Sequence, residues 1–231
     1  MTERRGDLTG ADCHAVVVGT GRYGGGGRVP LTALPSAAHS ARDLARALRE
    51  RCGMDGRVTE IIDPEGPTEV LAAVQAAIDA SEGGVVLFCF VGHGLLGPGR
   101  QLYLATSGTD SADDTVRAVP YDQISKRLGD AAASPVVVLD CCFSGLAEAA
   151  PQESYRELLI YARPEGSFLL TSATHYAASF PPAGERHTLF SGELLRLLNE
   201  GDAGGPAWFT LLDLYRILDH RFQGGPARPH R

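Results

Sequence analysis

Short apolar runs alternate with amphipathic stretches along most of the chain, and this alternation limits the fold more than any other feature. The runs at 13–19 and 84–91 have the length and the β-branched and aromatic content of buried strands. The stretches at 36–52 and 67–81 repeat apolar residues at helical spacing. Strands and helices in alternation indicate crossover units around a parallel sheet. We therefore predict an α/β fold, a three-layered α/β/α sandwich with a mostly parallel sheet of about six strands.

The same patterns place the remaining elements. We predict strands at 57–62, 135–139 and 167–171, a hairpin arm at 102–105, and helices at 121–128, 188–200 and 211–222. Thr210 precedes the last helix and Asp213 follows three positions later, which is the pattern of a capping box. The polar stretch 147–166 is a candidate linker, although its YRELLIYA segment also suits an ordinary surface helix.

Composition excludes several classes of partner. The 231 residues carry a formal net charge of −7, and no segment has the basic and aromatic character of a nucleic-acid interface. No apolar run reaches the roughly 18 residues of a membrane span, and the polar start MTERRGDLTG lacks the apolar core of a signal peptide. The five cysteines are odd in number, which favours thiols in a reducing compartment over a disulfide framework. We expect a cytoplasmic protein that binds neither nucleic acid nor a membrane.

Two reactive side chains follow two of the predicted strands. The strand at 84–91 leads into Gly92-His93-Gly94, and the strand at 135–139 leads into Asp140-Cys141-Cys142. If these strands are neighbours joined by the helix near Tyr121, a right-handed crossover brings both segments to the same edge of the sheet. A histidine and a thiol would then face each other.

Such a pair supplies the chemistry of a thiol nucleophile. A free cysteine is only a few per cent thiolate at neutral pH, and a nearby imidazole raises that fraction and later protonates a leaving amine. The backbone amides of Gly94 and Cys142 are candidates for an oxyanion hole.

Other interpretations stay open for these residues. A histidine between glycines also suits a turn, and a cysteine after a strand also suits a small core residue. Cys141 and Cys142 together suit a thiol-based redox sensor. A zinc site would need Cys89, His93, Cys141 and Cys142, but this set lacks the paired spacing of zinc ligands, so we expect no metal there.

The segments GHG at 92–94 and DCCFSG at 140–145 resemble the histidine and nucleophile loops of caspase-like cysteine peptidases, specifically the bacterial metacaspase-like proteins called orthocaspases. His93 precedes Cys142 by 49 residues, close to the ~50 of caspase-type peptidases. The resemblance extends through LPSAAHSARDLARAL, LYLAT, LLTSAT and TLFSGELLRLL and so covers nearly the whole chain.

The resemblance implies a single peptidase domain over 1–231. Its parts would be a large-subunit-like region at 11–146, the linker at 147–166 and a small-subunit-like region at 167–231. Cys142 would be the nucleophile and His93 its base, while Cys141 occupies a variable position that points into the structure. The implied activity is a cysteine endopeptidase without an organic cofactor, in a bacterial antiphage defence or regulated-cell-death system. A catalytically silent module that binds a partner protein is the alternative.

Substrate specificity is expected to depend on Asp140, which in this family lies at the floor of the pocket for the P1 side chain. An anionic floor favours Arg or Lys and repels a carboxylate. The second pocket aspartate of metacaspases is here Ser40, and two further positions depart from the family pattern, Val91 before the glycine and Phe143 after the nucleophile. With basic P1 specificity, Arg156 becomes a candidate self-cleavage site.

Two further motifs have weaker interpretations. Gly19-x-Gly21-x-x-Gly24 formally matches a dinucleotide fingerprint, but the glycines and prolines that follow delay the helix, so we expect a loop at the edge of the cleft. Asp110, Asp113 and Asp114 suggest calcium, which activates some metacaspases, but they lack the spacing of an EF-hand and suit a solvated loop better. The expected partners are a protein or peptide substrate and a separately encoded regulatory or sensor protein.

Overall fold

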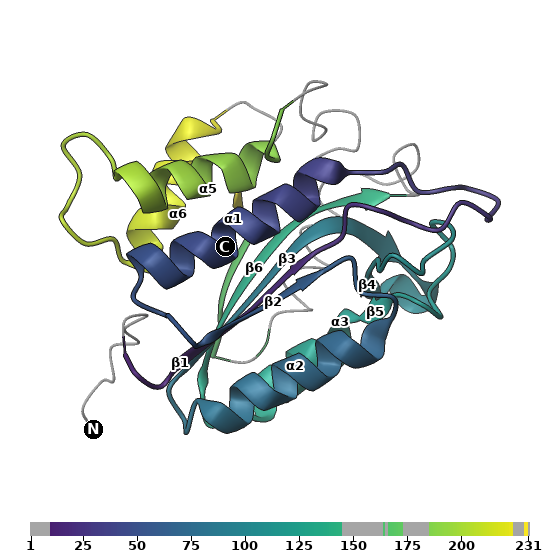
Figure 1. The fold of residues 1–231 in the computed structure, drawn as a ribbon, viewed down its shortest axis with the longest axis horizontal. Coiled ribbons are helices and arrows are strands. Elements are labelled where there is room, and N and C mark those ends of the chain that lie inside the picture. Colours follow the sequence, from purple (N-terminus) through teal and green to yellow (C-terminus); the bar gives the residue numbers. More distant parts are fainter. Residues whose placement is uncertain (1–9, 145–163, 165, 173–184, 224–228, 231) are drawn as a thin grey trace.

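Parallel strands form the centre of the molecule in a computed structural model that describes residues 10–144, 164, 166–172, 185–223 and 229–230 (Figure 1). The main strands run in the order β2-β1-β3-β6-β7-β8. Their bounds are Cys13–Gly19 for β1, Val58–Ile62 for β2, Val85–Leu96 for β3, Ser134–Ser144 for β6, Phe168–Ser172 for β7 and Pro229–His230 for β8. Every neighbouring pair from β2 to β7 is parallel, and β8 is antiparallel to β7.

A small antiparallel extension continues the sheet beside the end of β3. Strand β4 (Leu102–Leu104) pairs with β3 so that Gly94 is opposite Leu104, and β5 (Val119–Pro120) pairs with β4. A short 3-10 helix, η1 (Pro98–Arg100), turns the chain from β3 into β4. The hairpin arm predicted from the sequence is therefore present, with β5 as an addition that the sequence did not indicate.

Helices cover both faces of the sheet (Figure 1). One face carries α1 (Pro35–Arg51), α5 (Leu189–Glu200) and α6 (Leu211–Arg221), and the other carries α2 (Pro67–Ala80) and α3 (Tyr121–Asp130). Thr210 caps α6 in the predicted capping box, because its hydroxyl accepts from Asp213 N and Asp213 Oδ2 accepts from Thr210 N. The predicted three-layered sandwich with a mostly parallel sheet is confirmed.

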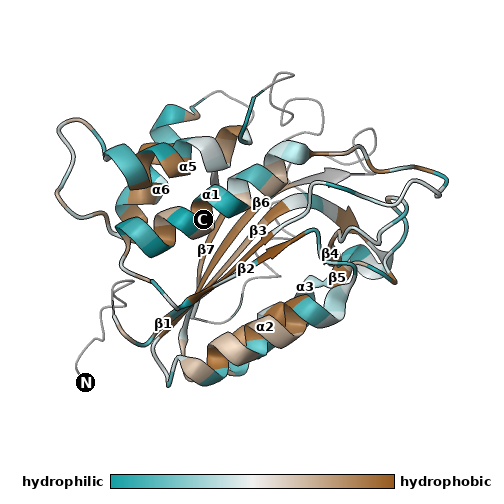
Figure 2. Cartoon of the chain, in the orientation of Figure 1, coloured by the Kyte–Doolittle hydropathy of each residue, from teal (hydrophilic) through white to brown (hydrophobic). Residues whose placement is uncertain are grey.

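The side chains of the central strands divide between two cores, which is why these strands are apolar throughout. On β3, Leu87, Cys89 and Val91 belong to the cluster under α1, α5 and α6, whereas Phe88 and Phe90 belong to the cluster over α2 and α3. Figure 2 shows the hydrophobic colour concentrated on the strands between the helical layers. Within the described ranges, no helix combines the length and apolar character that crossing a bilayer requires.

Strands β3 and β6 are longer than the sequence predicted, and this difference matters for the site. The prediction ended them at Val91 and Leu139, but pairing continues through Gly92↔Cys141, His93↔Cys142 and beyond. Glycine and aspartate have weak strand propensity, and Gly92, Gly94 and Asp140 interrupt the apolar runs, so local sequence does not show an extension that pairing with the neighbouring strand stabilises. The motif residues therefore lie on paired strands, not in the loops that follow them.

The close contact between α1 and β1 allows a test of the packing. A Cβ atom on Gly19 would lie 2.4 Å from Ala41 Cβ and 3.0 Å from the Ala37 carbonyl oxygen. Gly19→Ala should therefore lower the free energy of unfolding by about 1–3 kcal/mol, as overpacking does. Gly25→Ala is the matched control, because no atom lies within 4 Å of a Cβ there. Urea unfolding of both variants provides the measurement, and equal stabilities would contradict the packing described here.

Candidate active site

His93 is buried near the end of β3 and is held by groups from the loop between β1 and α1. Its Nε2 lies 2.8 Å from the Thr32 carbonyl oxygen, and its backbone N–H donates to the Tyr23 hydroxyl at 3.1 Å. The Tyr23 ring lies against the imidazole, with 4.8 Å between ring centroids and 44° between planes. The backbone carbonyl of His93 accepts from Ala105 N at 2.9 Å, so the main chain is fixed as well.

The contact with Thr32 assigns the tautomer of the neutral imidazole. A carbonyl oxygen only accepts, so Nε2 carries the proton and Nδ1 is the basic nitrogen. Burial lowers the pKa of His93 below its ordinary value of 6.5, and the Thr32 carbonyl partly opposes that shift. At neutral pH the ring is therefore in its neutral form, which is able to accept a proton.

The two adjacent cysteines occupy different surroundings. Cys141 is buried in the core over α2 and α3, in the same cluster as Tyr121. Cys142 is the backbone partner of His93 in the parallel pairing of β3 with β6. Paired residues on adjacent strands are separated by about the 4.8 Å strand spacing. The sheet thus brings together the backbone positions of the histidine and the second thiol, as the sequence predicted.

Asp140 is buried at the junction of β6, β7 and α5. Its Oδ1 accepts from Ser172 Oγ at 2.6 Å, and its Oδ2 accepts from Thr188 Oγ1 at 2.6 Å. Oδ2 also accepts from the backbone N–H and hydroxyl of Ser191, at 3.1 and 2.6 Å. Because Ser191 lies in the first turn of α5, the carboxylate also occupies the positive end of that helix.

Ser40, the other predicted specificity residue, lies beside this carboxylate. It is fully buried on α1, and its Oγ accepts from Thr188 N at 3.1 Å and lies 3.4 Å from Thr188 Oγ1. Thr188 thus links Ser40 to Asp140. The structure brings the two predicted specificity residues together through a third residue that sequence reasoning did not assign to the site.

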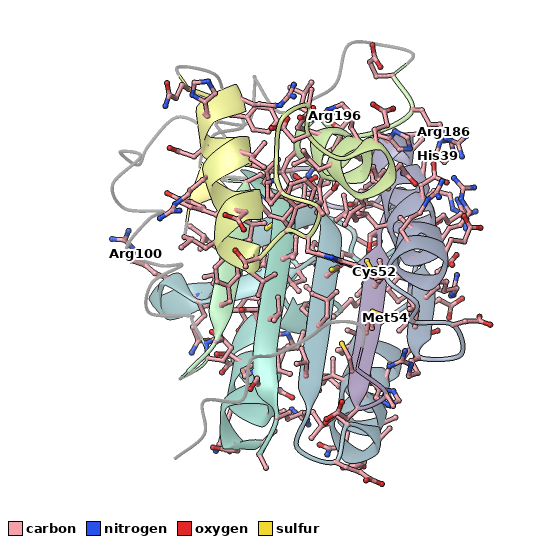
Figure 3. All side chains as sticks on the ribbon, turned by 90° about the vertical axis from the view of Figure 1, so that its left-hand side faces the viewer. His39, Cys52, Met54, Arg100, Arg186 and Arg196 are labelled. Atoms are coloured by element: carbon pink, nitrogen blue, oxygen red, sulfur yellow. The ribbon has the colours of Figure 1, made fainter. Side chains whose placement is uncertain are left out.

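A second buried carboxylate, Asp43 on α1, holds the residues that lead into α5. It accepts from Arg186 Nε at 2.9 Å and from His187 Nε2 at 2.7 Å, and it pairs with Arg46 at 2.9 Å. Figure 3 shows Arg186 on the side of the molecule that carries α1 and α5. Burial alone would raise the pKa of Asp43, but hydrogen bonds from Arg186 and His187 and the charge of Arg46 lower it to about 2.

The remaining metal hypotheses gain no support. Among the described residues no group of three or more His, Cys, Asp and Glu side chains could hold a metal ion. Asp110 pairs with Arg117, and Asp114 Oδ2 accepts from Asp110 N at 3.1 Å, so these carboxylates serve their own loop. Cys89 and Cys141 belong to opposite cores, and burial raises the pKa of the Cys89 thiol to about 12.

The glycine motif after β1 does not lead directly into a helix, because α1 begins only at Pro35. Gly94 and Cys142, the predicted oxyanion donors, both lie on paired strands. Arg156 and nearly all of the predicted linker 147–166 lie outside the described residues.

Sequence reasoning missed Thr32, Tyr23, Asp43 and Thr188. The first two occupy a loop without periodicity. Asp43 lies more than a hundred positions from Arg186 and His187, and Thr188 lies 48 positions from Asp140 and 148 from Ser40. Thr188 had one local signal, since it is the first residue of the helix predicted at 188–200, where a threonine suits a helix cap.

Comparisons with known proteins identify a family and a shared fold. The sequence model described as the caspase domain matches residues 12–227. No curated protein sequence matches. The structure of protein GSU0716 from Geobacter sulfurreducens is similar, with 17% identity, a TM-score of 0.64 and coverage of 94% of this chain and 91% of that one. Caspase-1 from Spodoptera frugiperda is similar, with 14% identity, a TM-score of 0.59 and coverage of 96% and 82%.

The structure titled pro-sf-caspase-1 is also similar, with 11% identity and a TM-score of 0.55. The match covers 100% of this chain and 92% of the pro-sf-caspase-1 chain. At these identities the three structures show a shared fold.

The Asp43 contacts predict a pH-dependent contribution to stability. The pKa of Asp43 falls from 3.8 to about 2 on folding, so its contribution is fully present above pH ~4 and is lost as the pH falls toward 2. Asp43→Asn removes the charge that these partners stabilise and should lower the free energy of unfolding at pH 7 by about 1–2 kcal/mol. The loss is modest because both arginine partners are largely exposed. The difference from the unsubstituted protein should shrink below pH ~4.

Chemical unfolding at several pH values measures this difference. Asp130→Asn, at the exposed end of α3, is the control that should leave stability unchanged within about 0.5 kcal/mol. A difference between Asp43→Asn and the unsubstituted protein that stayed constant down to pH 2 would rule out the carboxylate as its source.

Proposed function

Because the chain belongs to the caspase domain family, we propose that it is a cysteine endopeptidase in which Cys142 is the nucleophile and His93 the general base. The observation that carries the proposal is the register of β3 and β6, in which His93 and Cys142 are backbone partners. A family of cysteine peptidases and the juxtaposition of a histidine and a cysteine support the same chemistry.

The surroundings of His93 suit the role of base. Thr32 holds Nε2 in its protonated form, so the thiol proton passes to Nδ1. The thiolate attacks the scissile carbonyl carbon, and the imidazolium returns the proton to the departing amine nitrogen. Water then hydrolyses the acyl-enzyme to release the carboxylate product and regenerate the thiol. Burial lowers the pKa of His93, which keeps the free enzyme in the base form at neutral pH.

The amides of Gly94 and Cys142 are our candidates for the oxyanion hole. Gly94 directly follows His93 on β3, and the second amide belongs to Cys142 itself on the adjacent strand. Preorganised backbone donors of this kind typically contribute about 2.7–4 kcal/mol each to the transition state.

Asp140 supports a preference for a basic P1 residue, but its existing hydrogen bonds limit how it could contact that residue. The buried carboxylate is surrounded by neutral hydroxyls and one amide. Its negative charge therefore attracts a cation and repels an anion. Its oxygens already accept four hydrogen bonds, which leaves little capacity for a direct contact with a substrate guanidinium. Ser40 adds no second charge. The charge of Asp140, more than its hydrogen-bonding capacity, is therefore the basis of the proposed specificity.

A role in bacterial defence or regulated cell death, with a separately encoded regulator, rests on the family resemblance alone. The competing proposal is a silent binding module, which the replacement of the second acidic residue by Ser40 favours. Reactivity of the thiol distinguishes an enzyme from such a module.

Labelling with an arginyl chloromethyl ketone tests the nucleophile. We expect the unsubstituted protein to gain one adduct, Cys142→Ala to gain none, and His93→Gln to react at least about 100-fold more slowly, because the base is missing. Intact-mass spectrometry measures the adduct. Cys141→Ala is the matched neighbour control and should label normally, because Cys141 lies in the core. Loss of labelling in Cys141→Ala with retention in Cys142→Ala would show that Cys141 reacts and would contradict the proposed nucleophile. No adduct at all would favour the binding module.

Fluorogenic peptides test the specificity. Peptides with Arg at P1 should be cleaved at least about tenfold faster than matched peptides with Asp at P1, as kcat/KM. Asp140→Asn should reduce that ratio, because it removes the negative charge while keeping the size of the side chain. A thermal melt of this variant is needed as control, since Asp140 also holds β7 and α5. A preference for Asp would refute the specificity argument without affecting the proposed nucleophile.

A further inference from the structure

One loop, between β1 and α1, supplies two contacts that hold His93. Thr32 contacts the imidazole through its carbonyl, and Tyr23 contacts both the ring and the main chain. The carbonyl contact orients one nitrogen. The role of Tyr23 in the proposed chemistry is so far unassigned.

Tyr23 joins the histidine to the start of its own loop. Its hydroxyl donates to the Thr20 carbonyl at 2.6 Å and accepts from the His93 backbone N–H at 3.1 Å. Thr20 N in turn donates to the Val91 carbonyl at 3.0 Å. The hydroxyl therefore closes a hydrogen-bonded path from Val91 through Thr20 to His93, which fixes the backbone on both sides of Gly92.

Gly92 leaves the space that this arrangement needs. A Cβ atom there would lie 2.9 Å from Phe90 Cζ and 3.2 Å from the Tyr23 hydroxyl oxygen. The first glycine of the GHG motif thus lets Tyr23 approach the strand that carries His93. This contact is an explanation for that glycine besides close approach of a substrate.

The loop is anchored on both sides of Tyr23. Asp63 Oδ1 accepts from Gly21 N at 2.8 Å and from Arg22 N at 3.1 Å, and Gly24 N donates to the Thr109 carbonyl at 3.0 Å. Asp63 has a φ of 54°, a left-handed conformation that non-glycine residues rarely adopt. Such a conformation persists where surrounding contacts stabilise it, and here it directs the carboxylate to the two amides.

We propose that Tyr23 is a positioning residue for His93: its hydroxyl fixes the main chain of the histidine, its ring covers one side of the imidazole, and Asp63 holds the loop that presents it. This inference rests on the proposed role of His93 as the base. Tyr23 itself exchanges no proton with a substrate in this scheme.

The ring and the hydroxyl have separable effects. The ring contributes to the burial that lowers the pKa of His93, and its removal lets water reach the imidazole. The groups next to the imidazole include the Tyr23 phenol and the neutral Thr32 carbonyl, and Cys142 is its backbone partner on the adjoining strand. The Asp63–Arg22 ion pair joins the residue before Tyr23 to the carboxylate that binds the Gly21 and Arg22 amides. Burial is thus the main cause of the shift that the ring should influence.

Two variants at one position separate these effects. Tyr23→Phe keeps the ring and removes the hydroxyl, so we expect kcat to fall about tenfold with KM within about twofold and with the pH profile unchanged. Tyr23→Ala also removes the ring, so we expect a larger loss of kcat and an acid limb of kcat/KM that moves upward, toward the ordinary histidine pKa of 6.5. Tyr215→Phe on α6 is the matched control and should retain full activity.

The same question can be answered without catalysis. In a Cys142→Ala background, NMR titration of the His93 ring reports its pKa directly, with His93→Gln used for assignment. We expect an upward shift for Tyr23→Ala and none for Tyr23→Phe. Asp63→Ala should reproduce part of the shift although Asp63 does not touch His93, and Asp63→Asn, which keeps an acceptor for the two amides, should shift it less.

The outcomes distinguish this inference from the proposed function. Unchanged kcat in both Tyr23 variants, together with an unchanged His93 titration, would overturn the positioning role while leaving the peptidase intact. An unsubstituted protein that cleaves no peptide would overturn the peptidase, and the NMR shifts would still show whether Tyr23 governs the environment of His93.

Discussion

The parallel pairing of β3 with β6 is the constraint on which the candidate site depends. Its register runs from Val85↔Ser134 to Leu95↔Ser144 without interruption, so a slip of one residue would separate His93 from Cys142 and turn the side chains of the slipped strand to the wrong cores. The register is secured by the buried residues before the motifs, which alternate between two cores. The positions of the reactive residues are therefore determined by apolar packing several residues away.

Three buried polar side chains near this pairing have specific partners. His93 is held by a carbonyl and a phenol, Asp140 by three hydroxyls and an amide, and Asp43 by two arginines and a histidine. Burying such groups without partners would cost several kcal/mol each. Because the partners come from separate segments, the site also contributes to the order of the loops around it.

Much of the fold could be predicted from the sequence, since its strands and helices have strong periodicity. The bounds of β1 were predicted to the residue, and the cap of α6 followed from two residues three positions apart. Strand extension through Gly92 and Cys141 could not be predicted, because it depends on pairing with a neighbour and not on local propensity. The short strands β5 and β8 were missed for the same reason.

Only some of the residues of the candidate site could be predicted from the sequence. His93 and Cys142 could be singled out because their residue types are reactive and both follow buried strands. Tyr23 and Thr32 could not, because one contributes an aromatic ring and the other a backbone carbonyl from a loop of glycines and prolines. Asp43 has an unremarkable position on a helix, and only the fold brings Arg186 and His187 to it. Asp140 was identified as a pocket residue, whereas its four internal hydrogen bonds also make it a link between β6, β7 and α5.

Asp140 and Asp43 also join segments that are far apart along the chain. The ladder between β6 and β7, the bonds of Asp140 to Ser172 and Ser191, and the bonds of Asp43 to the residues before α5 all join parts that precede position 145 to parts that follow position 163. A backbone break anywhere between those positions would leave two fragments joined by a shared sheet and two buried carboxylates. The folded domain of this protein therefore does not depend on an unbroken polypeptide between those positions.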